Sequence, residues 1–198
     1  MTAAQAREVD RGASVRPARV DLATLGLSTL GGGMLLARIW LPVLGPPARI
    51  AALAGVLLAI LAASLIVPAA PGRARIGRGA ALAVGLAGVA ISLGTGGRPV
   101  PAPIVAWALP LTLLAAVAEE ALYRRAMYGA LERRGAVVAI GVTALAFALV
   151  HVPLYGLAAF PVDLGAGLLL SWQRWASGTW SVPAATHAAA NLLMTAMR

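Results

Sequence analysis

Two adjacent carboxylates, Glu119 and Glu120, lie in the middle of an otherwise apolar stretch. The chain of 198 residues holds only seven acidic residues, so this pair stands out from its surroundings. A charged side chain at the centre of a membrane-spanning helix costs about 2.5–3.5 kcal/mol on insertion scales. The two histidines of the chain, His151 and His187, also lie in apolar segments. Carboxylates and imidazoles are suited to general acid–base catalysis, so these four side chains are the first candidates for a functional site.

The spacing around the glutamates gives them different neighbours. Glu120 and Arg124 are four residues apart, which places them on one helix face at pairing distance. Glu119 points about 100° away from Glu120 around the helix axis. We therefore expect Arg124 to hold Glu120 as an orienting pair, while Glu119 faces another group.

His151 is the expected partner of Glu119. Glu119 lies 16 residues before Gly135, and His151 lies 16 residues after it. In an antiparallel helical hairpin that turns at Gly135, a rise of about 1.5 Å per residue brings the two side chains to similar depth. Phe147 is one turn before His151 and shares its face, where it can form a wall of the site.

His187 and Asn191 place two further hydrogen-bonding groups on one face of the last helix. The chain turns near Ser177 and Gly178 before this helix begins, so both side chains can point into the same site. Polar side chains also join transmembrane helices by hydrogen bonds, and this structural role is the alternative for both histidines.

The composition indicates a membrane protein rather than a soluble domain. Hydrophobic residues make up 60% of the chain and charged residues 12%, whereas a soluble domain has about a quarter charged. The net charge of +9 comes from 16 basic residues, all arginines, which gather near the ends of apolar segments. This distribution follows the positive-inside rule and does not indicate a nucleic-acid partner. No cysteine is present, which excludes disulfides and thiolate catalysis.

The predicted fold is an all-α, polytopic membrane helix bundle with about seven transmembrane helices. The expected spans are 22–44, 50–70, 79–93, 103–133, 136–152, 160–174 and 180–197. Residues 1–21 form a polar tail with four arginines. If this tail is cytoplasmic, twelve arginines lie inside and three lie outside, while Arg38 falls within the first span. The sequence therefore predicts a multi-pass protein of the inner, cytoplasmic membrane with a cytoplasmic N-terminus.

Three ordered motifs resemble the CPBP family, the CAAX-prenyl-protease and bacteriocin-processing (Abi) intramembrane proteases. They are Glu119-Glu120-x-x-x-Arg124, Phe147-x-x-x-His151 and His187-x-x-x-Asn191. The resemblance covers about residues 104–195. It implies that 101–198 form a catalytic helical core, preceded by N-terminal transmembrane helices within 22–100.

The resemblance also implies an activity. Members of this family are endopeptidases that cut a peptide bond within or beside the bilayer, and prenylated CAAX proteins are the substrates of the eukaryotic members. By this resemblance, Glu119 and His151 activate a water molecule, and His187 and Asn191 stabilise the oxyanion. The remaining motif residues have supporting roles: Glu120, Arg124 and Phe147. The implied partners are the lipid bilayer and a peptide or protein substrate, which can itself be membrane-anchored.

Other chemistries remain open from the sequence. Glu119, His151 and His187 could bind a zinc ion with water as the fourth ligand. However, the chain lacks the H-E-x-x-H pattern that places two histidines on one helix face, and a metal-free mechanism without a cofactor is favoured. A non-catalytic immunity or scaffold protein that retains the fold is the alternative function. A proton-coupled transporter is a third possibility, but it lacks the inverted repeats that would support it.

Overall fold

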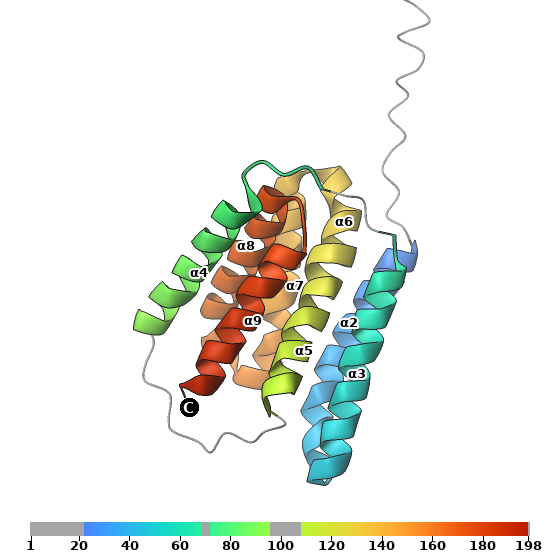
Figure 1. The fold of residues 1–198 in the computed structure, drawn as a ribbon. Helices are drawn as coiled ribbons and strands as arrows, with labels where there is room; N and C mark the ends of the chain where they lie inside the picture. Colours follow the sequence, from blue (N-terminus) through green and yellow to red (C-terminus); the bar gives the residue numbers. More distant parts are fainter. Residues whose placement is uncertain (1–21, 69–71, 96–107, 198) are drawn as a thin grey trace, which may run out of the picture.

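The computed structural model describes residues 22–68, 72–95 and 108–197, and these residues contain helices and no strand. In chain order the helices are α2 (Leu22–Leu36), η1 (Ala37–Val43), α3 (Pro46–Ile66), α4 (Arg78–Thr95), α5 (Ala108–Glu120), η2 (Ala121–Met127), α6 (Tyr128–Leu131), η3 (Glu132–Arg134), α7 (Ala136–Tyr155), η4 (Leu157–Ala159), α8 (Phe160–Ser177) and α9 (Ser181–Ala196). The prediction of an all-α fold is confirmed (Figure 1).

The helices follow the predicted segments, with differences at their ends. The first segment is not one α-helix, because α2 ends at Leu36 and continues as the 3₁₀-helix η1. Pro42 lacks the backbone N–H that a continued α-helix would need at that position. The last α-helical turn of α7 runs through Pro153 to Tyr155, beyond the predicted end at 152. The predicted tail 1–21 and residues 103–107 lie outside the described residues.

Two of the described helices have the length and composition to cross a membrane, namely α3 and α7. Helix α4 is apolar but shorter. The outer surface carries many exposed large apolar side chains, such as Trp40 with 72% of its surface exposed. Such a surface suits contact with lipid. Seven transmembrane helices remain a prediction.

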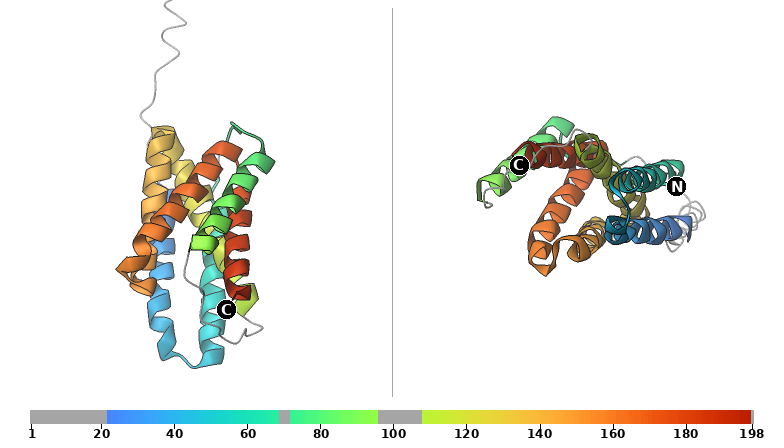
Figure 2. Two further views of the ribbon diagram at one scale, coloured as in Figure 1. Left: turned by 90° about the vertical axis from the view of Figure 1, so that its left-hand side faces the viewer. Right: turned by 90° about the horizontal axis from the view of Figure 1, so that it is seen from below.

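The helices run alternately up and down the molecule (Figure 1). The pair α2–α3 and helix α4 form opposite edges, with α5 and its continuation between them (Figures 1 and 2). Helix α5 contacts α3 on one side and α9 on the other, while α7 packs along α8. This order places α5 between α3 and α9, which carries His187, while α7, which carries His151, contacts α2 directly.

Glycines allow α8 to approach its neighbours closely. A Cβ atom at Gly167 would lie 2.9 Å from the backbone oxygen of Ala144 in α7. A Cβ atom at Gly88 in α4 would lie 2.8 Å from Leu169 in α8. Close approach of small residues is the usual way in which membrane helices associate.

Hydrogen bonds also join the N-terminal helices to the rest of the chain. The guanidinium of Arg125 donates to the carbonyl groups of Ser64, Leu65 and Val67 at the end of α3. These carbonyl groups have no partner within the helix, because they lie in its last turn. The side chain of Arg125 therefore closes α3 and ties it to η2.

Candidate active site

Glu119 lies near the end of α5, with 3% of its surface exposed, and its two oxygens have different neighbours. Its Oε1 accepts a hydrogen bond of 3.1 Å from Nη1 of Arg38. Its Oε2 lies 3.7 Å from Nε2 of His151 on α7. The predicted approach of Glu119 and His151 across the hairpin is confirmed.

The contacts of His151 define which of its nitrogens can accept a hydrogen bond. Its Nδ1 lies 2.7 Å from the backbone oxygen of Phe147. A carbonyl oxygen only accepts, so Nδ1 carries the hydrogen and Nε2 is an acceptor in the neutral ring. Nε2 of His151 and Oε2 of Glu119 are then two acceptors that face each other. A water molecule between them can donate to both.

Glu120 is fully buried and is held by two donors. Its Oε1 accepts a hydrogen bond of 2.9 Å from Nη1 of Arg124, as the four-residue spacing predicts. The same oxygen lies 3.0 Å from Nδ1 of His187 on α9. Arg124 also donates a hydrogen bond of 3.1 Å to the backbone oxygen of Gly167 on α8. Glu120 therefore orients His187, while Arg124 joins the pair to α8.

Phe147 lies between the two histidines. Its ring centroid is 4.5 Å from that of His151 and 5.7 Å from that of His187. On another side Cζ of Arg124 lies 4.6 Å from the centre of the same ring. Phe147 thus forms the wall that the sequence predicts, and its packing restricts the rotation of both imidazoles.

Asn191 is placed differently from the other motif residues. Its Nδ2 donates a hydrogen bond of 3.1 Å to the backbone oxygen of Thr112 on α5. No hydrogen bond joins Asn191 to either glutamate or either histidine in the described part of the chain. Its observed contact docks α9 onto α5, and the second hydrogen of its amide remains available as a donor.

The helix widens immediately after the glutamates. Residues Ala121–Met127 form the π-helix η2, which contains Arg124. Wide turns of this kind occur frequently at functional sites. Helix propensities give no signal for a π-turn, and the sequence did not predict it.

Two charged residues near the site were not among the predicted site residues. Arg38 contacts Glu119, and its position within an apolar segment was a signal for function. Asp163 lies in the first turn of α8, and its Oδ2 is buried with no hydrogen-bond partner among the described residues. The carboxyl group of Asp163 lies within electrostatic range of His151, Glu119 and His187. Asp163 is thus a third carboxylate close to the site.

The structure does not bring the three residues of the alternative zinc site together at one point. His187 bonds to Glu120, not to Glu119, so the predicted ligands Glu119, His151 and His187 are divided between two carboxylates. The described residues contain no group of three or more His, Asp or Glu side chains arranged for a metal ion. In addition, Arg38 and Arg124 each place a positive charge against a glutamate, which opposes a cation at the same oxygens.

A comparison with known families matches the C-terminal half of the chain. Residues 101–193 match the family model described as type II CAAX prenyl endopeptidase, Rce1-like. No curated protein and no solved structure matches the chain. The matched stretch contains all three motifs and excludes Arg38. Residues 101–193 therefore belong to the CPBP/CAAX protease family, a family of membrane-associated peptidases, as the three motifs indicated.

Proposed function

We propose that this protein is an intramembrane endopeptidase in which Glu119 and His151 activate a water molecule. The observation that supports this proposal most directly is the pair of acceptors, Oε2 of Glu119 and Nε2 of His151, at a separation of 3.7 Å. A water molecule that donates to both is held with its oxygen lone pairs free for attack. The burial of Glu119 keeps bulk water away from this position.

Each motif residue has a role in this mechanism. Glu119 accepts a proton from the water molecule while the water oxygen bonds to the scissile carbonyl carbon. Glu119 then gives this proton to the leaving nitrogen, and the carbon–nitrogen bond breaks. When His187 carries two protons beside the Glu120 carboxylate, its Nε2–H is free to donate to the oxyanion. The second amide hydrogen of Asn191 is the other donor.

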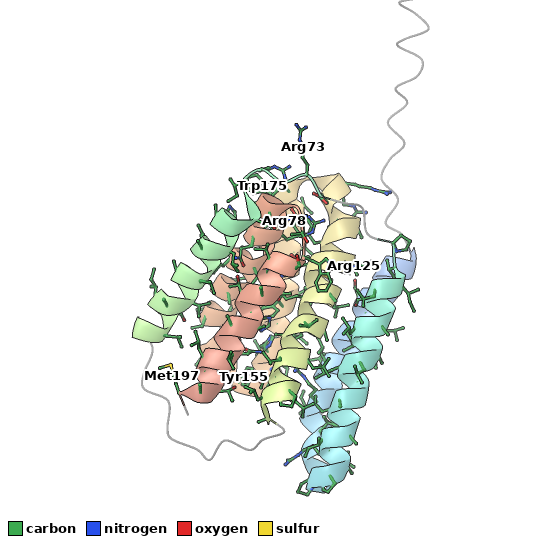
Figure 3. All side chains as sticks on the ribbon, in the orientation of Figure 1. Arg73, Arg78, Arg125, Tyr155, Trp175 and Met197 are labelled. Carbon is green, nitrogen blue, oxygen red and sulfur yellow. The ribbon has the colours of Figure 1, made fainter. Side chains whose placement is uncertain are left out.

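The bilayer is the proposed environment, with the N-terminus in the cytoplasm and the chain crossing the inner membrane several times. Arg73 and Arg78 lie toward one end of the molecule, while Tyr155 and Met197 lie toward the other (Figure 3). This separation agrees with the positive-inside rule and supports a cytoplasmic position for the arginine-bearing end. The proposed substrate is a peptide or protein that is itself anchored in, or lies against, the membrane.

A comparison of membrane peptides tests the activity in cells. We expect a strain with the wild-type protein to yield cleavage products that are missing from a deletion strain. A deletion strain that expresses His151→Ala should lack the same products, because the water loses one of its two acceptors. Mass spectrometry of membrane fractions measures the products, and immunoblotting confirms equal amounts of both proteins. If His151→Ala restores the products, or if it supports the cellular phenotype without them, the non-catalytic scaffold is the better explanation.

Removal of metal ions tests the proposed absence of a cofactor. We expect the purified protein to cleave its substrate at the same rate before and after treatment with a strong zinc chelator. The physical reason is that the arginines already neutralise both glutamates. A loss of cleavage on chelation that zinc reverses would reject the metal-free mechanism.

A further inference from the structure

Arg38 lies outside 101–193, yet its side chain bonds to a motif residue of the site. It lies in η1, and 81 positions separate it from Glu119 along the chain. Its Nε donates a hydrogen bond of 3.1 Å to the backbone oxygen of Leu35, and its Nη1 donates to Oε1 of Glu119 at the same distance. One bond therefore fixes the guanidinium to its own helix, and the other reaches across to α5.

The placement of Arg38 is costly for the fold. The side chain is 14% exposed, and its Nη2 is buried with no hydrogen-bond partner among the described residues. A buried donor without a partner lowers stability, and a charged side chain in an apolar segment adds to this cost. An apolar side chain at position 38 paired with an apolar side chain at 119 would avoid both penalties. The pair therefore calls for an explanation other than stability.

The two carboxylate oxygens of Glu119 have different partners, and this supplies the explanation. Arg38 binds Oε1 and leaves Oε2 to face Nε2 of His151. Without a donor on Oε1, the carboxylate could rotate about its last torsion angle, which is broad for a glutamate. The position of the water between Oε2 and Nε2 would then no longer be fixed.

We propose that Arg38 is a positioning residue for Glu119, and that the N-terminal helices thereby complete the active site. This inference rests on the proposed function, since it assigns Glu119 as the base. Arg38 does not contact the reacting atoms; it acts by fixing the carboxylate that does. A purely structural ion pair would contribute to stability alone and leave the catalytic rate of the folded protein unchanged.

Kinetics of the full chain in detergent distinguish the two roles, with a farnesylated peptide that ends in a CAAX sequence as the probe. We expect Arg38→Met to lower kcat by about 10²-fold, the usual cost of a misplaced catalytic group, with KM unchanged. Arg38→Lys should recover most of kcat, because an ammonium group can also donate to Oε1. Arg49→Met is the matched control, since its side chain takes no part in the site, and it should behave as the wild type.

A double-mutant cycle tests the contact without any substrate. Arg38→Met should lower the melting temperature by more in the wild-type background than in the Glu119→Gln background. Only in the wild-type background does the loss of Arg38 leave a buried carboxylate without its partner. If the effects of the two substitutions on the melting temperature are additive, the proposal is overturned. It is also overturned if these effects are coupled but Arg38→Met leaves kcat unchanged. Failure of the wild type to cleave the farnesylated peptide would count against the proposed activity on that substrate. In that case the melting temperatures would still decide whether Arg38 holds Glu119.

Discussion

Glu119→Gln is expected to remove nearly all peptidase activity while the protein stays folded. Glutamine has the shape of glutamate, and its amide oxygen can still accept the hydrogen bond from Arg38. It cannot take up a proton from water, however, and removal of a general base typically costs about 10²–10⁴-fold in rate. The measurement is kcat of the purified variant, together with its melting temperature in the same detergent.

Glu120→Gln is the matched comparison, because both glutamates are buried neighbours on one helix. Its amide oxygen can still accept from Arg124 and His187, so we expect a smaller loss of kcat than for Glu119→Gln. A larger loss of kcat for Glu120→Gln than for Glu119→Gln would show that Glu120 is the base and Glu119 the supporting residue. Equal and slight losses would contradict the assignment of either glutamate as the base.

The second large effect is expected on stability. Arg124→Met should lower the stability of the folded protein by about 3–5 kcal/mol, because it leaves Glu120 as a buried charge without its main partner. Arg124 and Glu120 are both fully buried. The substitution also removes the hydrogen bond that Arg124 donates to the backbone oxygen of Gly167. Thermal unfolding in detergent, followed by circular dichroism, measures this loss.

Two variants make the stability result specific. Arg133 is exposed in η3, so Arg133→Met should change stability by less than about 0.5 kcal/mol. A double variant with Arg124→Met and Glu120→Leu removes both charges and should recover much of the lost stability, because no buried charge then remains unpaired. It should not recover activity, since His187 loses its orienting carboxylate. Equal melting temperatures for Arg124→Met and Arg133→Met would contradict the structural importance of the buried pair.

The contacts that the sequence predicted are those that depend on short-range geometry. Glu120 and Arg124 are four residues apart on one helix, so their pairing follows from helical periodicity. Glu119 and His151 are equally far from Gly135, which has a positive φ of 107° at the start of α7. A short connection between antiparallel helices fixes their relative depth, and simple counting is then sufficient.

The features that the sequence did not predict depend on distant packing or on subtle backbone geometry. Arg38 reaches Glu119 only because α2 packs beside η2, and no periodic pattern relates the two residues. The amide of Asn191 turns to the backbone of Thr112, although its spacing from His187 placed it on the same face. The buried oxygen of Asp163 depends on how α8 begins, at a point where an acidic residue is usual on helix-dipole grounds alone.

The π-helix after Glu120 has a consequence for how the sequence can change over evolution. A π-turn contains an additional residue relative to an α-helix, and deletion of one residue within 121–127 would restore α-helical bonding. Each residue of a π-helix turns the chain by less than the ~100° of an α-helix, so the wide turns absorb the additional residue. Loss of that residue would therefore leave the preceding helix, and the direction in which Glu119 points, largely unchanged. Substitutions in this stretch are more demanding, because Ala121, Leu122, Tyr123, Arg124 and Ala126 are buried.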